Sequence, residues 1–308
     1  MKVIFIVNEQ AGGGKGARVW KKIKSQLTIP YIVHISDYSG HVVHLAKQYT
    51  LEKEESILLL AVGGDGTIHE VIEGSAGNDH IQIGAMKAGS GNDFARGYYI
   101  FEKVSDVENY YYHHNSELKA MDLGQITLED QSSHSFVNNS GIGFDAFITT
   151  TLNQSRLKRW LNYVKLGRLS YMILTIWALF TFKRFNAVIH SGEQTHRFRN
   201  VWFISICNGP YFGGGMKISP SSRSDDQQLE LTVVHDLSRI KLLLVFMTVF
   251  WGKHVKFREV EMLQSAQFSL QVDAPTVSHV DGEFLGHISA EKTITCQLDS
   301  RKWYLAKC

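Results

Sequence analysis

An apolar run that ends in a glycine-rich turn constrains this chain more than any other feature. Residues 57–62 read Ile-Leu-Leu-Leu-Ala-Val, and Gly63-Gly64-Asp65-Gly66-Thr67 follows directly. Such a run is typical of a strand buried on both faces, and we expect a helix to begin near Thr67 after the turn. Free N–H groups at a helix start attract anions, and glycines let the backbone come close. The pattern indicates a site for nucleotide phosphates, where Asp65 can hold Mg²⁺ or a phosphate-bound water.

Strand and helix patterns alternate through the first 122 residues. This rhythm predicts a mostly parallel sheet with helices on both faces, in which ligands bind beyond the carboxyl ends of the strands. The predicted strands are residues 3–7, 31–35, 57–62 and 81–85, and the predicted helices are 16–27, 41–49, 67–73 and a short one near Asp93.

The pattern changes after about residue 122. Short strand-like segments then dominate, and they favour an antiparallel β-sandwich with inserted helices. The predicted strands are residues 118–128, 135–139, 187–190, 201–207, 229–235, 265–272, 276–279 and 293–298, and the predicted helices are 163–182 and 240–251.

Composition excludes several classes of protein. The three cysteines, Cys207, Cys296 and Cys308, form no CxxC pair, so neither a zinc knuckle nor a disulfide framework is supported, and a reduced cytoplasm fits. A net charge of +2 gives no argument for nucleic acid. The longest uncharged apolar stretch is the 14 residues 169–182, shorter than the ~18–20 needed to span a bilayer, so any membrane contact is expected to be peripheral.

Two further glycine-rich segments follow predicted strands. The first, residues 8–16, reads Asn-Glu-Gln-Ala-Gly-Gly-Gly-Lys-Gly and lacks the spacing of a P-loop. The second, residues 87–96, reads Lys-Ala-Gly-Ser-Gly-Asn-Asp-Phe-Ala-Arg. Either could be an ordinary connection, and Asn92 or Asp93 could simply cap a helix. Because parallel strands end at one edge of a sheet, these segments and residues 63–67 can also converge on one ligand.

Taken in order, these segments resemble the diacylglycerol kinase catalytic-domain family, in its soluble bacterial lipid-kinase branch. Four more segments extend the resemblance: Gly40-His41, residues 138–145 (Asn-Asn-Ser-Gly-Ile-Gly-Phe-Asp), residues 208–216 (Asn-Gly-Pro-Tyr-Phe-Gly-Gly-Gly-Met) and Asp281-Gly282-Glu283. The resemblance implies an N-terminal α/β Rossmann-like domain of the phosphofructokinase and NAD kinase type, followed by a C-terminal antiparallel β-sandwich. We place the nucleotide-binding domain at residues 1–122, which residues 299–308 could complete, and the lipid-substrate domain at 123–298.

The resemblance also implies roles for individual residues. Asp281 would be the general base that takes the proton from a lipid hydroxyl, with Asp65 and Glu283 beside it. Asp226 would hold a structural Mg²⁺ with the main-chain carbonyls of Arg223 and Gln228. ATP would be bound by Asn8, Glu9, Gln10, Ala11, Gly12, Ser36, Gly63, Gly64, Asp65, Gly66, Thr67, Ile68, His69, Glu70, Ser90, Asn92 and Asp93.

Four positions depart from the family pattern. Glu9 stands where the family has proline, Ser90 where it has threonine, and Asp37 where a second hydroxyl is common. Gln227 replaces the glycine that usually follows the metal-binding aspartate, so the predicted turn and its Mg²⁺ site depend on whether glutamine can adopt the same backbone.

The expected activity is transfer of the γ-phosphoryl group of ATP to a membrane lipid, with diacylglycerol as the default acceptor. Two alternatives remain open: a soluble small-molecule kinase of the NAD kinase or phosphofructokinase type, and a nucleotide-binding regulator without catalysis. Cationic and aromatic side chains in residues 156–168, followed by 169–182, suit an anionic lipid interface or a solvated face beside a core helix. The expected location is the cytoplasm, transiently at the inner face of the membrane. A homodimer is left open by the resemblance.

Overall fold

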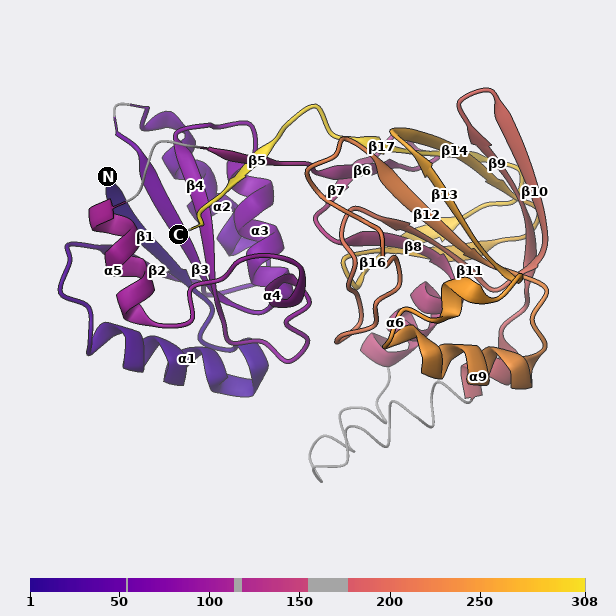
Figure 1. Ribbon diagram of the computed structural model, residues 1–308, viewed down its shortest axis with the longest axis horizontal. Coiled ribbons are helices and arrows are strands. Elements are labelled where there is room, and N and C mark those ends of the chain that lie inside the picture. The colour runs from indigo at the N-terminus through magenta and orange to yellow at the C-terminus, as the bar shows by residue number, and fades with distance from the viewer. Residues whose placement is uncertain (54, 114–117, 155–176, 308) are drawn as a thin grey trace.

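The computed structural model describes residues 1–53, 55–113, 118–154 and 177–307. The described residues form three six-stranded sheets. One sheet, with helices around it, makes an α/β half, and the other two sheets make a β-rich half beside it (Figure 1). The predicted fold class, an α/β domain followed by an antiparallel β-sandwich, is confirmed.

The α/β half takes its elements from both ends of the sequence. They are β1 (Lys2–Val7), α1 (Ala11–Lys24), β2 (Ile32–Ile35), α2 (His41–Gln48), η1 (Tyr49–Leu51), β3 (Ile57–Gly63), α3 (Asp65–Ser75), β4 (Ile81–Lys87), α4 (Phe94–Gly97), α5 (Val104–His113), β5 (Lys119–Met121) and β18 (Trp303–Leu305). Its sheet has the order β2-β1-β3-β4-β18-β5. All neighbours pair in parallel except β5, which pairs antiparallel with β18.

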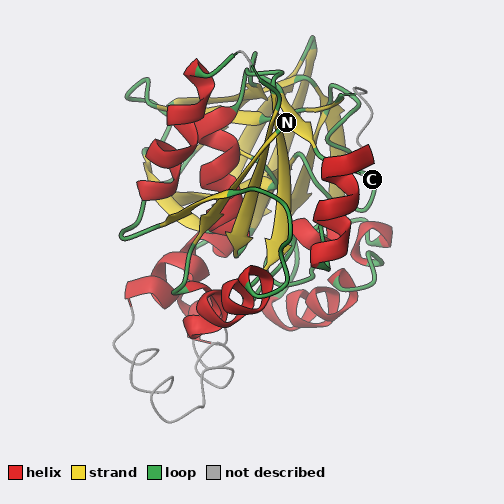
Figure 2. Cartoon of the chain, turned by 90° about the vertical axis from the view of Figure 1, so that its left-hand side faces the viewer, coloured by secondary structure: helices red, strands yellow, loops and turns green. Residues whose placement is uncertain are grey.

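Strand β3 lies inside this sheet, which is why its apolar run is unbroken. All seven of its residues are buried. Leu59 and Ala61 pack with α2 and α3 on one face, while Leu58 and Leu60 pack with α1 and α5 on the other. Helices therefore cover both faces of the sheet (Figure 2).

The β-rich half is a sandwich of two antiparallel sheets. Its elements are β6 (Gly124–Thr127), β7 (Ser133–Phe136), β8 (Asn139–Gly143), α6 (Phe144–Gln154), β9 (Phe185–Ser191), β10 (Gln194–Val201), β11 (Phe203–Cys207), β12 (Leu229–Val234), α9 (Arg239–Val249), η2 (His254–Lys256), β13 (Val260–Ser265), β14 (Gln267–Val272), β15 (Thr276–Val280), β16 (Glu283–Ile288) and β17 (Thr293–Leu298). The sheet orders are β10-β9-β14-β17-β6-β7 and β13-β12-β11-β8-β15-β16.

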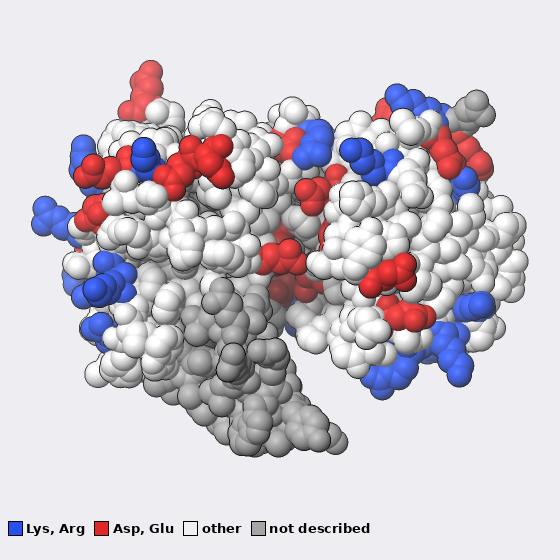
Figure 3. Space-filling model, turned by 180° about the vertical axis from the view of Figure 1, so that it is seen from behind, with Lys and Arg blue, Asp and Glu red and all other residues white. Residues whose placement is uncertain are grey.

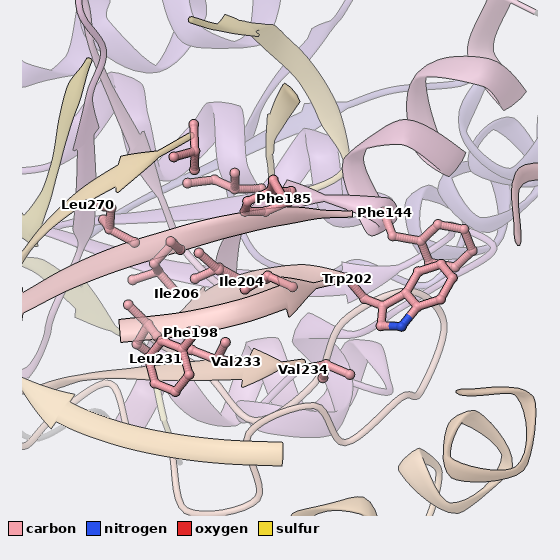
Figure 4. Close-up of a cluster of buried hydrophobic side chains, with 14 of the residues drawn as sticks. Phe144, Phe185, Phe198, Trp202, Ile204, Ile206, Leu231, Val233, Val234 and Leu270 are labelled. Atoms are coloured by element: carbon pink, nitrogen blue, oxygen red, sulfur yellow. The ribbon is translucent and has the colours of Figure 1, made fainter. Parts of the chain in front are cut away.

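Side chains from both sheets fill the sandwich, and helices close one end of it. Ile204 and Ile206 of β11, Leu231 of β12 and Leu270 of β14 share one buried cluster (Figure 4). Trp202 lies at the edge of this cluster and packs on Phe144 of α6, with 5.4 Å between ring centroids. This contact anchors α6 at the end of the sandwich.

Some predicted elements were wrong in extent. The single strand predicted over residues 118–128 is two strands, β5 and β6, in different sheets, because the chain crosses from one half to the other at Asp122. The strand predicted over 135–139 likewise divides between β7 and β8. Helices α5 and α6 and strands β10, β13, β16 and β18 were not predicted.

The helix predicted over residues 163–182 falls mostly outside the described residues. Residues 177–181 are helical. Among the described residues, no helix is long and apolar enough to cross a membrane.

Candidate active site

The glycine-rich turns after β3 and β4 touch each other. A side chain on Gly89 would place its Cβ 2.5 Å from the Cα atom of Gly64, closer than two carbons that are not bonded to each other can lie. Gly12 follows β1 in the first turn of α1, where the backbone is not helical; it has φ of 59°, and a Cβ there would lie 2.4 Å from the carbonyl oxygen of Ala88. Only glycine fits these positions, so three turns converge at the carboxyl edge of the sheet.

A cleft of about 500 Å³ opens where these turns meet, and we call it the polar cleft. Its walls include most of the residues predicted to bind the nucleotide: Asn8, Gln10, Ala11, Gly12, Ser36, Gly64, Asp65, Gly66, Thr67, Glu70 and Ser90. Glu283, from the β-rich half, also lines it. The N-terminus of α3 lies in this wall, so its free N–H groups and the positive end of its dipole favour an anion there.

Five predicted nucleotide-binding residues do not line the polar cleft. Glu9 and Gly63 are absent from its walls, and Ile68 is part of the core under the sheet. Asn92 donates a hydrogen bond to the carbonyl of Gly89 at 3.1 Å and so shapes the turn. His69 points to the other half of the molecule, as described below.

Asp93, a sixth such residue, joins the two halves. It is buried, and its carboxylate accepts hydrogen bonds from the backbone N–H groups of Gly214 and Gly215, each at 2.7 Å. Arg96 bonds the same carboxylate at 2.9 Å. Its role in the structure is therefore to hold the glycine turn of residues 213–215 against the α/β half.

A second, apolar cavity of about 800 Å³ lies in the β-rich half, and the sequence analysis did not predict it. We call it the apolar cavity. Aliphatic and aromatic side chains make most of its wall, and they come from α6, residue 179, β11, β12 and α9: Phe144, Ile148, Leu179, Phe203, Val234, Leu242, Leu243, Val245, Phe246 and Val249. These residues are far apart in the sequence, so no motif could have identified them.

The two spaces meet at three residues. Asp65, Ser90 and Gly91 line both the polar cleft and the apolar cavity, and Asp281 lines the apolar cavity beside them. Acidic side chains gather along the junction of the two halves (Figure 3). An apolar molecule in the cavity could thus present a polar group to Asp65.

Asp65 interacts with fewer hydrogen-bond donors than Asp281, namely the backbone N–H groups of Phe94 and Asn92. Its Oδ1 atom accepts the backbone N–H of Phe94 at 2.9 Å. Partial burial raises the pKa of Asp65 above its usual value, and the neighbouring charge of Asp93 adds to the rise. A carboxylate with a raised pKa is a stronger proton acceptor than an ordinary one.

Asp281 is held on all sides. Its carboxylate accepts the backbone N–H groups of Val137, Asn138 and Asn139 at 2.7–2.9 Å and the Nδ1 atom of His69 at 2.7 Å. Burial alone would raise the pKa of Asp281, but the hydrogen bond and charge of His69 outweigh it and lower the pKa. These four donors occupy the lone-pair sites of the carboxylate, which lowers its basicity.

His69 lies between two acids. Its Nε2 atom is 3.5 Å from the carboxylate of Glu73, opposite the bond to Asp281. Burial by itself would lower the pKa of His69, but hydrogen bonds to Asp281 and Glu73 raise it to about 10. The imidazole is therefore a cation at neutral pH, and it ties α3 to the β-rich half.

The backbone turn expected at the predicted structural metal site is present, although glutamine replaces glycine there. Gln227 has φ of 60°, the left-handed conformation that glycine would adopt there, and its N–H donates to Asp122 at 2.7 Å. Buried Glu230 lies near Asp226, and burial together with that charge raises its pKa. Among the described residues no three acidic, His or Cys side chains form a metal-binding group, so a cation at Asp226 would also need backbone carbonyl ligands.

Comparison with known proteins identifies the family. The diacylglycerol kinase catalytic domain matches residues 2–126, and the YegS C-terminal NAD kinase beta sandwich-like domain matches residues 139–298. The chain belongs to the diacylglycerol kinase family of bacterial lipid kinases. Members of this family use ATP as phosphoryl donor, so the α/β half carries the kinase machinery.

Relatives with similar sequences carry lipid-kinase names. A Bacillus subtilis protein named "Putative lipid kinase YtlR" is 31% identical over 92% of this chain and 93% of its own length. The "Diacylglycerol kinase" of Mycobacterium tuberculosis is 28% identical over 76% of this chain and 72% of its own. The chain is accordingly a lipid kinase.

Solved structures share the fold. A diacylglycerol kinase from Bacillus anthracis superposes with a TM-score of 0.66 over all of this chain and 97% of its own, at 16% identity. Yeast NADH kinase superposes with a TM-score of 0.57 over all of this chain and 84% of its own, at 11% identity. The arrangement of an α/β half and a sandwich is thus common to lipid kinases and NAD(H) kinases.

Proposed function

We propose that this lipid kinase transfers the γ-phosphoryl group of ATP to the free hydroxyl of diacylglycerol. The observation that carries the proposal is the meeting of the polar cleft and the apolar cavity at Asp65 and Ser90. ATP, entering as its Mg²⁺ complex, would place its phosphates among the glycine turns, while acyl chains occupy the apolar cavity. The acceptor hydroxyl would then lie at the junction. Relatives named as diacylglycerol kinases support this acceptor.

We propose Asp65 as the group that accepts the hydroxyl proton, in place of the Asp281 predicted from the sequence. The raised pKa of Asp65 and its position at the junction support this role. Asp281, with four donors on its carboxylate and a lowered pKa, suits a positioning role. Glu283 lines the polar cleft and would face the phosphates or their Mg²⁺.

A structural Mg²⁺ is proposed near Asp226. Two observations support it: Gln227 keeps the left-handed turn that a glycine would make there, and the carboxylate of Glu230, near Asp226, is the kind of oxygen ligand that Mg²⁺ prefers. The carbonyls of Arg223 and Gln228 would complete the ligands. When bound, the cation would neutralise the acids of this turn.

The experiment is transfer of labelled γ-phosphate from Mg-ATP to a panel of lipids in mixed micelles. The wild type is compared with Asp65→Asn, Asp281→Asn and Glu283→Gln, each checked for folding by thermal melting. We expect label in diacylglycerol and a fall in kcat of about 100-fold or more for Asp65→Asn, the usual loss when a general base is removed.

Each other outcome identifies a different function. If kcat fell more in Asp281→Asn than in Asp65→Asn, we would conclude that Asp281, and not Asp65, is the general base. Label in another lipid alone would replace diacylglycerol as the acceptor. Label in no lipid, with ATP still bound, would favour a soluble acceptor or a regulator without catalysis.

A further inference from the structure

Helix α9 carries apolar side chains on two opposite faces. Leu242, Val245 and Val249 are buried against the β-rich half. On the other face the exposed fractions are 74% for Ile240, 67% for Leu244, 57% for Met247 and 68% for Trp251, just beyond the helix. A helix at a water-exposed surface normally alternates apolar and polar faces, so an apolar outer face calls for a partner.

The outer face of α9 continues onto residues 177–180. Trp177 and Phe180 are 49% and 64% exposed, and Arg239 at the start of α9 donates to the carbonyl of Leu179 at 3.0 Å. Together these two segments carry eight of the fifteen exposed large apolar side chains among the described residues. We call them the lipid-docking face: Trp177, Phe180, Ile240, Leu243, Leu244, Met247, Phe250 and Trp251.

The lipid-docking face borders the apolar cavity. The inner residues of α9 and Leu179 line that cavity, and Leu243 both lines the cavity and is 40% exposed on the surface. Both segments lie at the same end of the sandwich (Figure 1). An acyl chain that leaves a bilayer at this face would therefore reach the cavity without crossing water.

The charged residues around the lipid-docking face indicate what kind of partner binds there. Residues 237–258 contain five Lys or Arg residues and no Asp or Glu. Glu259, next in sequence, pairs with Lys241 and Arg258, whereas no ion pair within the described residues involves Lys253 or Lys256, which are exposed. Unpaired cations beside aromatic and aliphatic side chains match an anionic phospholipid surface.

We propose that the lipid-docking face binds an anionic phospholipid bilayer and so opens the apolar cavity to the membrane. This inference rests on the proposed function, since it names the surface through which the lipid acceptor arrives. Helix α9 has 11 residues, too few to span a bilayer, so it lies in the interface with Leu244, Met247 and Trp251 among the acyl chains. Lys253 and Lys256 then reach the phosphate groups.

The test is flotation of the full chain with vesicles of phosphatidylcholine and 30% phosphatidylglycerol. The double substitution Leu244→Gln/Met247→Gln removes apolar contact and leaves the cavity wall unchanged. We expect it to weaken vesicle binding by about tenfold or more. Lys253→Gln/Lys256→Gln is expected to bind about thirtyfold more weakly. That charge effect should vanish in 0.5 M salt and on pure phosphatidylcholine.

Matched controls come from the α/β half. Leu51 and Tyr112 are 85% and 63% exposed, so Leu51→Gln/Tyr112→Gln removes a similar apolar surface far from α9. Lys21→Gln/Lys22→Gln removes two exposed cations from α1. Both controls should float like the wild type. Equal losses in the controls and in the α9 variants would overturn the proposal, as would a wild type that binds no vesicle.

A second copy of this chain is the competing occupant. The wild type could be a dimer in analytical ultracentrifugation that Leu244→Gln/Met247→Gln makes monomeric. If the wild type also bound no vesicle, the face would be a dimer contact and not a bilayer contact.

Assays with a water-soluble short-chain diacylglycerol test this proposal separately from the proposed function. The α9 variants should phosphorylate it like the wild type, because docking is not needed. If the protein bound vesicles but phosphorylated no lipid, the proposed kinase activity would be refuted and the lipid-docking face would still be supported.

Discussion

His69 and Asp281 come from different halves of the chain and lie 2.7 Å apart (Nδ1 to carboxylate oxygen). The family resemblance implied that His69 binds the nucleotide, yet its side chain bonds Asp281 and does not line the polar cleft. Because burial favours neutral groups, this ion pair persists only through the hydrogen bonds to Asp281 and Glu73. At the scale of single residues, the pair sets where the β-rich half stands relative to α3.

His69→Asn should alter how stability depends on pH. The pKa of His69 is raised from 6.5 to about 10, so its contribution is fully present below pH 6.5 and is lost as pH rises to about 10. The lowered pKa of Asp281 adds stability that is present at neutral pH and lost only in acid, below its usual 3.8. Urea unfolding should show the wild type more stable by about 1–3 kcal/mol at pH 7, with the difference shrinking toward pH 10. A constant difference across that range would contradict the assignment.

At the scale of elements, the glycine turns act as a unit because their backbones touch. Gly64 caps α3, and Gly89 packs against it from the turn after β4. The spacing of the N–H groups that we propose bind phosphate therefore depends on the absence of two Cβ atoms. Neither turn can move outward alone without disturbing the other.

Gly89→Ala is expected to weaken ATP binding by about tenfold or more. Its Cβ would lie 2.5 Å from Gly64, and overpacking of this kind costs about 1–3 kcal/mol. Calorimetric titration with ATP measures the effect. Gly97→Ala, whose Cβ meets nothing closer than 3.7 Å, is the control and should bind ATP normally. Unchanged affinity in Gly89→Ala would show that the turns are not coupled.

The sequence predicted the elements that local patterns specify. The run 57–62 and the turns around Gly12, Gly64 and Gly89 could be placed because apolar periodicity and glycine are local signals. The apolar cavity could not be predicted, because Phe144, Leu179 and Val249 meet only through the sandwich topology. The partners of Asp93 and His69 were missed for the same reason, because they come from the β-rich half, more than 100 residues away in sequence.

At the scale of the whole molecule, the proposed catalysis depends on the junction between the halves. Asp93 accepts the N–H groups of Gly214 and Gly215 there, and Tyr98 bonds Ser224 at 2.5 Å. These contacts hold the apolar cavity against the polar cleft. A small rotation at the junction would separate the acceptor from the phosphates.

Asp93→Ala should therefore lower kcat more than it lowers ATP affinity. It leaves two N–H groups without their acceptor, at about 1–3 kcal/mol each, and loosens the junction. We expect kcat on diacylglycerol to fall about tenfold or more while the Kd for ATP changes less than about threefold. Asp79→Ala, at an exposed position, is the control. A larger loss of ATP affinity than of kcat would place Asp93 among the nucleotide ligands, as the sequence predicted.

Strand β18 fills the space between β4 and β5, although it follows the whole β-rich half in the chain. During synthesis, β4 therefore waits with an unpaired edge until the sandwich has been made, and β5 has no partner in its sheet. The sheet of the α/β half is completed only after the β-rich half has been synthesised. A ribosome that stalls early would therefore release a fragment whose α/β sheet has an open edge, and such an edge is prone to aggregate.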